Sequence, residues 1–299
     1  MITVVDEAII DLETCVAGLA ATQFHPDDPD NLGHAARLLR QLGNNREFLG
    51  DLLVEELAHR HRDDPAGNPY GPQSLILSAP GSSNFFLRGN IWPSRDEHML
   101  RASGGSAFVY GLPHDHNFNF LTLGYFGPGY WSDYYEFAYD AVTGWRGEPV
   151  DLRFVERSRL EEGKIMLYRA HRDVHRQLPP DALSVSINVM HTSGAQGWLD
   201  QYAFDIGQGM GKVARILSAG SSEAFLRISV GLGHAEARDL ARHFGRRHPS
   251  DRMRLAAWSA LAAAEPDNDE RDAVWRAAET SGSRLVSAEA RLRRRARAG

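Results

Sequence analysis

The sequence predicts an α+β protein whose core is an antiparallel β-barrel or jelly roll, flanked by helical segments at both ends. Short runs rich in β-branched and aromatic residues, separated by Gly, Pro, Asn or Asp, extend from residue 74 to about residue 231. Helical periodicity is confined to the two ends of the chain. Between the short runs there is no helical stretch long enough for the crossovers of a parallel sheet, so we expect antiparallel pairing.

The two ends have the periodicity of amphipathic helices and define the expected domains. Apolar residues between positions 31 and 42 recur three and four apart, and a second helical segment spans residues 45–62. Prolines and glycines between residues 63 and 72 then end the pattern, which returns after residue 234. We therefore expect an N-terminal helical segment at 1–70, a β-barrel metal domain at 71–231 and a C-terminal helical segment at 232–299.

The middle of the chain contains the expected strands. The clearest hairpin joins residues 118–125 to residues 130–139 through a Phe-Gly-Pro-Gly turn. The runs that we expect to form strands cover residues 83–92, 107–110, 118–126, 131–139, 164–168, 183–190, 198–204 and 225–230. Their number and spacing are typical of a sandwich or barrel.

Composition limits the classes of function. The 299 residues include 33 Lys and Arg against 39 Asp and Glu, a net charge of -6 that argues against a general nucleic-acid binder. The start of the chain lacks the basic region of a secretory signal, and no apolar run approaches the ~20 residues of a membrane helix. We therefore expect a cytoplasmic protein that binds no membrane. With 13 His and 1 Cys, a metal or acid–base site must be built from histidines and carboxylates.

The segment His114-Asp115-His116 has the clearest chemical signal. If this stretch is extended, side chains two positions apart share a face, so the two histidines point the same way as Phe118 and Phe120. Two imidazoles beside bulky aromatic side chains would supply two metal ligands and the apolar walls of a pocket. Imidazole suits iron, zinc, copper or nickel, and the remaining ligands must come from elsewhere in the chain.

Two further histidines, His171 and His175, follow after a Gly-containing turn and precede a Val-Ser run at residues 185–189. With the His-x-His motif upstream, this order resembles the cupin superfamily, in which a second motif supplies a histidine shortly before another strand. Within the cupins the chain most resembles the thiol dioxygenase (cysteine dioxygenase-like) branch of non-haem iron enzymes. The resemblance covers residues 84–205.

The resemblance implies a site and its cofactors. His114, His116 and His175 would bind Fe(II), with another divalent metal as an alternative, and O₂ would be the co-substrate. Arg88, on an upstream run, matches an arginine that holds the substrate carboxylate in that branch. His171 competes with His175 for the third ligand position, and we favour His175 because its distance to the following strand is nearer that of the family.

The chain also departs from the family. The general cupin pattern has a glutamate after the His-x-His motif, where this chain has Phe120 and Leu121. The first carboxylate that could serve as a ligand is Glu136, on the expected partner strand, and a one-residue change of register would exchange its face with that of Tyr135. Some family members form a thioether cross-link from a cysteine near this position. Because residue 121 is Leu, that cross-link is impossible here, and we do not expect a cysteine dioxygenase.

Aromatic residues between positions 125 and 139 supply the candidate catalytic groups. These side chains either pack the core or line the pocket as proton-donating phenols, and we take Tyr135 and Tyr139 as the candidates. Arg88 and Arg101 would each anchor a carboxylate through a bidentate bond.

We therefore expect a mononuclear non-haem iron oxygenase or dioxygenase that oxidises a small carboxylate- or amino-acid-like molecule. The alternatives are a ligand-binding or regulatory cupin module and a non-redox metal-dependent isomerase or lyase. The partner would be a small-molecule substrate, and the terminal helices would cover the barrel or form a homodimer contact. We expect no nucleic-acid partner, because the arginines at 291–297 are better interpreted as a solvated helix terminus.

Overall fold

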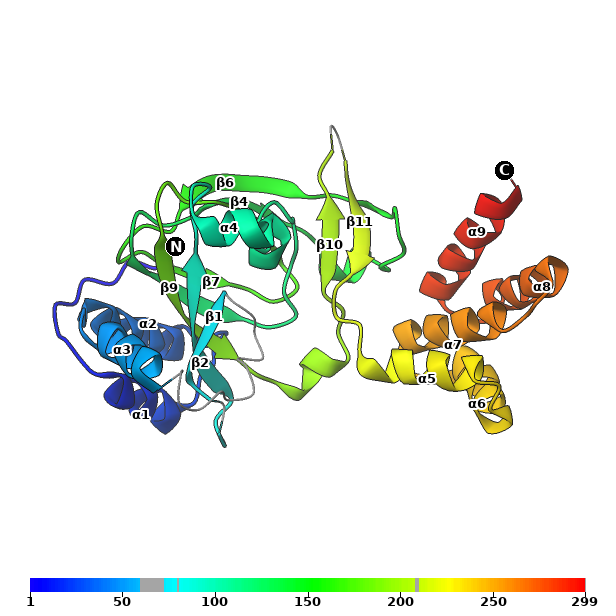
Figure 1. Cartoon of the computed structure of the whole chain (residues 1–299), viewed down its shortest axis with the longest axis horizontal. Helices are drawn as coiled ribbons and strands as arrows, with labels where there is room; N and C mark the ends of the chain where they lie inside the picture. Colours follow the sequence, from blue (N-terminus) through cyan, green and yellow to red (C-terminus); the bar gives the residue numbers. More distant parts are fainter. Residues whose placement is uncertain (60–72, 80, 208–209, 299) are drawn as a thin grey trace. The chain divides into compact units, whose positions relative to one another are not determined.

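The computed structural model describes residues 1–59, 73–79, 81–207 and 210–298. These residues form two compact units, one combining Met1–Phe137 with Leu152–Gln196 and the other combining Ala138–Asp151 with Gly197–Gly299 (Figure 1). We call them the first unit and the second unit. The predicted division at residues 70 and 231 follows the order of helices and strands, whereas these units follow tertiary contacts.

Three helices begin the first unit: α1 (Leu12–Thr22), α2 (Pro29–Asn44) and α3 (Phe48–His59). The side chain of Asp28 caps α2 by accepting bonds from the Asp30 and Asn31 N–H groups, and Pro29 fits the first helical position because its missing N–H needs no partner there. Leu39 and Leu42 are buried, as the helical periodicity of this segment predicts. The helices predicted near residues 31–42 and 45–62 are therefore confirmed as α2 and α3 over the part that is described.

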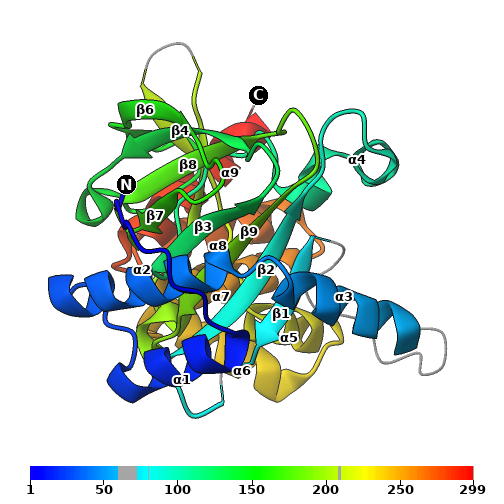
Figure 2. The same ribbon diagram turned by 90° about the vertical axis from the view of Figure 1, so that its left-hand side faces the viewer.

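The larger sheet has the strand order β1-β2-β9-β3-β7, with every neighbouring pair antiparallel. Its strands are β1 (Ser74–Ser78), β2 (Phe85–Trp92), β3 (Phe120–Phe126), β7 (Ile165–Tyr168) and β9 (Ser184–His191). The helices α1, α2 and α3 lie over one face of this sheet (Figure 2).

Strand β3 is buried on both faces. Leu121 and Leu123 pack with the helices, whereas Phe120 packs on the opposite face with aromatic residues of the second sheet. Six of its seven residues are buried for this reason. The face that carries Phe120 is the one that leads to the histidines.

A three-stranded sheet of order β6-β4-β8 faces this side. Its strands are β4 (Trp131–Glu136), β6 (Arg153–Arg159) and β8 (Asp173–Leu178). The predicted hairpin of residues 118–125 with 130–139 is wrong, because β3 pairs with β7 and β9 while β4 pairs with β6 and β8. Consecutive strands therefore belong to different sheets.

The predicted α+β class with antiparallel strands is confirmed. A closed barrel is not formed, because strand pairing among the described residues gives three separate sheets, of five, three and three strands. Two predicted strands are wrong. Residues 107–110 follow α4 (His98–Ser103) and include the end of the 3₁₀ helix η1 (Gly105–Phe108), and residues 225–230 lie inside helix α5 (Ser221–Gly231).

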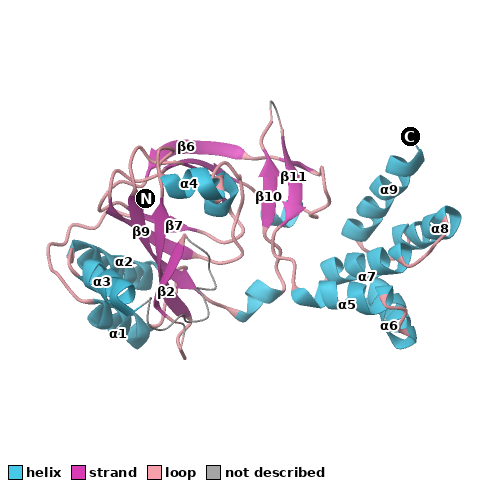
Figure 3. Cartoon of the chain, viewed as in Figure 1, coloured by secondary structure: helices cyan, strands magenta, loops and turns pink. Residues whose placement is uncertain are grey.

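The second unit joins a small sheet to helices (Figure 3). The sheet has the order β10-β11-β5 and is preceded by the 3₁₀ helix η2 (Tyr139–Ala141). Its strands are β5 (Pro149–Val150), β10 (Tyr202–Asp205) and β11 (Gly211–Ile216), and η3 (Gly194–Gly197) precedes β10 along the chain. After α5 come α6 (Ala235–Arg247), α7 (Asp251–Ala263), α8 (Asn268–Glu279) and α9 (Arg284–Ala298).

None of the helices in the described part of the chain combines the length and the hydropathy that a bilayer-spanning segment requires.

Candidate metal centre

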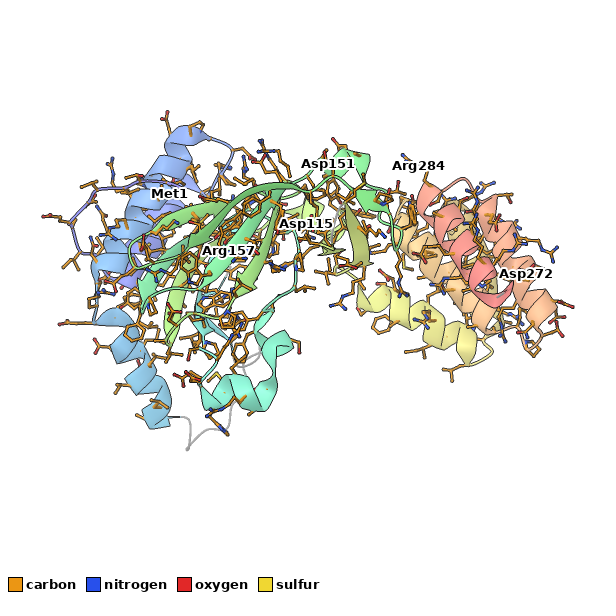
Figure 4. The ribbon with its side chains drawn as sticks, turned by 90° about the horizontal axis from the view of Figure 1, so that it is seen from above. Met1, Asp115, Asp151, Arg157, Asp272 and Arg284 are labelled. Carbon is orange, nitrogen blue, oxygen red and sulfur yellow. The ribbon has the colours of Figure 1, made fainter. Side chains whose placement is uncertain are left out.

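Three histidines of the first unit come together where β8 meets the segment before β3. The backbones of His114 and His175 exchange two hydrogen bonds, of 3.0 and 2.9 Å, so the two residues lie directly opposite each other. His116 follows two residues later, and its carbonyl accepts a bond of 2.9 Å from the N–H of His171. Figure 4 labels Asp115, the buried residue between the two histidines of the motif.

The imidazole nitrogens of the three histidines converge. His175 Nε2 lies 2.9 Å from His116 Nε2 and 3.2 Å from His114 Nε2. One ligand atom from each residue can be chosen so that all three lie within 4.8 Å of one another. His114 and His175 are buried, and His116 is half-buried. The described residues thus contain a three-histidine group that could hold one metal ion.

The protonation of His114 follows from its hydrogen bond. Its Nδ1 lies 2.9 Å from the Leu112 carbonyl oxygen, which can only accept, so Nδ1 carries the proton and Nε2 keeps a free lone pair. Fixing one ring nitrogen in this way orients the other toward a metal.

Burial keeps all three imidazoles neutral. Loss of hydration lowers the pKa of His114 to about 4, against a small opposing effect of its bond to Leu112. The same burial, together with neighbouring histidine charges, holds the pKa values of His116 and His175 well below their usual range. A neutral imidazole is the form that binds a metal.

The donor set fits a divalent transition metal. Metal–imidazole bonds of roughly 2.1 Å place adjacent nitrogens of an octahedral ion about 3.0 Å apart. The distances from His175 Nε2 to the other two Nε2 atoms, 2.9 and 3.2 Å, are close to that value, and all three ligand atoms lie within 4.8 Å of one another. Three neutral nitrogens suit iron, zinc, copper or nickel better than magnesium or calcium, which prefer oxygen ligands.

Aromatic rings enclose the cluster. The His116 ring lies 4.9 Å from the Phe118 ring and 5.0 Å from the Phe120 ring, between ring centroids. The Tyr168 ring lies 4.5 Å from the His175 ring and stacks on Phe120 at 4.5 Å. The apolar walls expected beside the His-x-His motif are therefore present.

Three buried tyrosines form a hydrogen-bonded group beside the histidines. The Tyr134 and Tyr168 hydroxyls lie 2.8 Å apart, and Tyr168 also bonds to Tyr130. Burial is the main cause that raises the pKa values of all three, for Tyr130 to about 12, so the phenols are neutral at physiological pH. Tyr130 and Tyr134 belong to the aromatic residues at 125–139 that were expected around the site, but the predicted catalytic residues were Tyr135 and Tyr139, and Tyr168 was not predicted. Their signal was alternation: Tyr134 pairs with His175 and therefore shares its face.

Arg88 lies on the face of β2 that carries Phe86 and Trp92, since side chains two positions apart share a face. The pKa of His116 is lowered mainly by burial, then by the charge of His114, and also by the guanidinium of Arg88. The same guanidinium also slightly lowers the pKa of Tyr130. Arg88 thus acts electrostatically on one of the three histidines, His116, and on one of the buried tyrosines, Tyr130.

The other predicted catalytic phenols lie elsewhere. Tyr135 is half-buried, packs against Phe154 with ring centroids 5.4 Å apart, and neighbours the Asp133 charge. Asp133 is bound by Arg157, labelled on β6 in Figure 4, and by Arg176. Alternation along β4 places Tyr135 on the face opposite Tyr134, so it does not reach the histidines from this strand position.

Tyr139 belongs to the second unit. Its hydroxyl donates to the Asp200 carbonyl at 3.0 Å and accepts from the Asp200 N–H at 2.8 Å, and its ring lies 5.6 Å from that of Tyr202. Through these contacts Tyr139 holds η2 against the segment that leads into β10.

Glu136 stands outside the three-histidine group. One of its carboxylate oxygens accepts a bond of 2.7 Å from Arg169, and the other is bound by Arg153. These arginines lower the pKa of the carboxyl group. The expectation that Glu136 faces the metal depended on the hairpin that does not form. In the structure, both of its carboxylate oxygens are instead hydrogen-bonded to arginines.

His171 has a positive φ of 57° at the turn between β7 and β8. Its backbone N–H supports the His116 carbonyl, but its ring is not part of the three-histidine group. The geometry therefore favours His175 over His171 as the third nitrogen.

No family model matches the sequence, and no curated protein matches it. Solved structures that are similar to parts of the chain include the following three. One, from a study of the DMSP lyases RdDddP and RnDddQII, has a TM-score of 0.25 and 15% identity over 45% of this chain and 52% of its own. This chain therefore spans about half the length of that structure.

The second is hydroquinone 1,2-dioxygenase PnpCD in complex with Cd²⁺ and 4-hydroxybenzonitrile, with a TM-score of 0.25 and 10% identity over 52% of this chain and 77% of its own. The third is described as a mannose-6-phosphate isomerase from Ralstonia eutropha JMP134, with a TM-score of 0.21 and 10% identity over 44% and 96%. Likenesses of this size establish neither the fold nor the activity of this chain. The cupin resemblance and its thiol dioxygenase branch stay predictions.

Proposed function

We propose that this chain is a metal-dependent enzyme, a mononuclear non-haem iron oxygenase that oxidises a small carboxylate- or amino-acid-like molecule with O₂. The observation that carries the proposal is the group formed by His114, His116 and His175, three neutral imidazoles whose Nε2 atoms converge within the first unit. A bound Fe(II) ion would supply open positions at which substrate and O₂ meet.

The residues around the histidines have separate tasks in this proposal. Arg88 would bind the substrate carboxylate, because a guanidinium forms a planar pair of hydrogen bonds with it. The rings of Phe118, Phe120 and Tyr168 would exclude water from the reacting centre. The tyrosine group would hold protons on its hydroxyls, since burial raises the pKa values of its members.

A second candidate is a metal-dependent lyase or isomerase that uses no oxidant. The observation that favours it is the tyrosine group, Tyr130, Tyr134 and Tyr168. Hydrogen-bonded phenols beside a metal site can donate a proton to a substrate or accept one from it without any redox step. Oxygen uptake separates this candidate from the oxygenase.

The test begins with metal content. We expect the protein purified from iron-supplemented cells to contain about one iron per chain, and His116→Ala to reduce the iron severalfold because one of three ligands is lost. His98→Ala is the matched control, since His98 is exposed at the start of α4 in the same unit. Equal iron in wild type and His116→Ala would overturn the assignment of the site.

Activity is then measured on the iron-loaded protein with a panel of amino acids and small carboxylates. Oxygen consumption that depends on one of these compounds supports the oxygenase. Turnover that continues under strict anaerobiosis identifies the lyase or isomerase instead. Arg88→Gln should raise KM for a carboxylate substrate more than it lowers kcat, because Arg88 is assigned to binding. Iron without turnover of any compound would favour a ligand-binding module.

A further inference from the structure

A cavity of about 420 Å³ lies within the second unit. Its walls come from β11, from the helices α5, α7 and α9 and from the turn before β5. The last helix that contributes to the wall is α9, and its first residue, Arg284, is labelled in Figure 4. Concave sites of this size hold small molecules rather than macromolecules. The proposed function makes no use of this cavity.

The walls have an excess of positive charge. The arginines that line the cavity are Arg146, Arg215, Arg227, Arg252 and Arg293, and the acidic residues are Glu223 and Glu289. Arginine recognises phosphate and carboxylate groups through its planar set of donors. The excess of guanidinium groups therefore points to an anionic ligand.

Two of the arginines are held by the protein itself. Arg252 is half-buried and donates to Asp200 at 2.6 Å and to Glu223 at 2.9 Å. Arg293 lies over the Trp275 ring at 4.7 Å. These two residues build the wall, and the charge of Arg252 is already balanced.

The other three arginines are available to a ligand. Arg146, Arg215 and Arg227 are exposed, and none of them belongs to an ion pair with another described residue. The backbone N–H of Arg146 donates to Glu289 at 2.8 Å, which fixes that segment while leaving its guanidinium free to turn inward. Three exposed arginines without an ion pair thus line one cavity.

The N-terminus of α5 opens onto the same space. Gly220 is its N-cap, and Gly220 and Ala224 both line the cavity. A Cβ placed on Gly220 would meet nothing within 4 Å, so there is open space beside the backbone at this end of the helix. The N–H of Gly220 itself donates to the Glu223 carboxylate at 3.3 Å, which leaves the first N–H groups of the helix for a ligand. The first N–H groups of a helix and its dipole favour phosphate.

Part of the lining is apolar. Ile216, Leu255 and Leu285 line the cavity together with several alanines. We propose that the cavity binds an organic phosphate, a small molecule whose phosphate group is held by the arginines and the α5 N-terminus and whose apolar body packs on these side chains. The proposal is independent of the chemistry at the three histidines.

A nucleic acid is a less suitable occupant. The arginines that would extend a basic surface along α9 are largely paired, as Arg294 donates to Asp272 at 2.8 Å and to Glu279 at 2.7 Å. A backbone-tracking surface requires cations that are free to contact successive phosphates. Around the cavity, by contrast, Arg146, Arg215 and Arg227 belong to no ion pair with a described residue.

The test is calorimetric titration of the full chain with phenyl phosphate, and with inorganic phosphate and benzoate as partial probes. We expect saturable binding of phenyl phosphate, weaker binding of inorganic phosphate and the weakest binding of benzoate. The double variant Arg215→Ala/Arg227→Ala should lose about tenfold or more in affinity, because each arginine supplies charge-assisted hydrogen bonds. Both residues are exposed, so the variant should fold, and circular dichroism checks this.

The matched control is Arg246→Ala/Arg247→Ala, which removes the same charge from exposed positions on α6 that do not line the cavity. Its affinity should stay within about twofold of wild type. Equal losses in the two double variants would show non-specific attraction and overturn the proposal. So would an absence of saturable binding at millimolar phenyl phosphate, a preference for benzoate, or binding of single-stranded RNA alone.

Discussion

Burial sets the protonation of the three histidines, and protonation sets what they can bind. In water an imidazole with a pKa of about 6.5 is partly charged near neutral pH. The described structure lowers the pKa of His114 to about 4 by removing water from its ring, and burial also holds the pKa values of His116 and His175 well below their usual range. A neutral donor set therefore exists before any metal arrives.

This residue-scale effect predicts how the metal-free protein responds to acid. The folded pKa values lie below the unfolded value of about 6.5, so the unfolded chain binds more protons between pH 6.5 and pH 4 and stability falls as the pH falls. Each such histidine contributes a slope of about 1.4 kcal/mol per pH unit in this window. Urea unfolding at several pH values, after removal of metal with a chelator, measures the slope.

The variant His114→Asn isolates one histidine, because asparagine can keep a bond to the Leu112 carbonyl while losing the titration. Its stability should fall with pH less steeply than that of wild type, by about 1.4 kcal/mol per pH unit. The interpretation is wrong if the two slopes coincide, or if wild-type stability is unchanged from pH 6.5 to pH 4.

Glu136 offers a second residue-scale prediction. Glu136→Gln should leave the metal content unchanged, because both carboxylate oxygens are bound by arginines and lie outside the three-histidine group. The loss of stability should be modest, about 1 kcal/mol or less, since the pairs with Arg153 and Arg169 are partly exposed. Metal analysis of the purified variant decides the matter, and a loss comparable to that of His116→Ala would restore Glu136 as a ligand.

At the scale of elements, the turn between β3 and β4 shows why the hairpin was mispredicted. The Phe-Gly-Pro-Gly segment has the composition of a hairpin turn, and Gly127 and Gly129 both have positive φ, of 77° and 82°. A Cβ on Gly127 would lie 2.3 Å from the Leu183 carbonyl, and one on Gly129 would lie 1.9 Å from the Leu160 carbonyl. The turn is thus packed against distant segments and directs the chain into the other sheet, which local sequence does not encode.

The run at residues 225–230 shows a different limit. Its branched and aromatic residues have the preference of a strand, yet they form the middle of α5. Leu226 and Val230, four residues apart, are buried in the helical core, whereas Phe225 and Ile228 are exposed. Helical packing against neighbours outweighs local preference here. By contrast, α2 and most strands of the first unit were predictable, because their periodicity and their burial agree.

Two glycines of α2 give a prediction at the scale of one helix. A Cβ on Gly43 would lie 2.6 Å from the Leu123 side chain of β3, whereas one on Gly33 would meet nothing within 4 Å. Alanine has the better helix propensity at both positions, by roughly 1 kcal/mol. Gly33→Ala should therefore stabilise the protein, while Gly43→Ala should destabilise it by about 1–3 kcal/mol through overpacking.

Chemical unfolding of the two variants under identical conditions makes this comparison. Because both substitutions are in one helix, propensity and unfolded-state effects nearly cancel between them. Stabilisation by both alanines would show that α2 does not approach β3 as closely as the structure describes.

At the scale of the whole molecule, each unit has its own buried core. The core of the first unit joins α1 and α2 to the larger sheet, and a second cluster lies around Trp92 and Tyr168 beside the histidines. The core of the second unit is formed by its helices around Trp258 and Trp275. The sequence could indicate where helices and strands lie, but not that residues 138–151 join the C-terminal unit, because that depends on the pairing of β5 with β11.

Separate cores predict separate unfolding, with the metal acting on one unit only. Calorimetry of the full chain should show two transitions, since chains with several compact units depart from two-state behaviour. Gly43→Ala should lower one transition, and Trp258→Phe, which removes the bond from Trp258 Nε1 to the Gly245 carbonyl, should lower the other. Metal at about 100 times its Kd should raise the transition of the first unit by roughly 5–10 °C and leave the second in place. The shift should vanish in His116→Ala. A single transition that moves as a whole with metal would mean that the two units unfold cooperatively, and the histidines would then stabilise the entire chain.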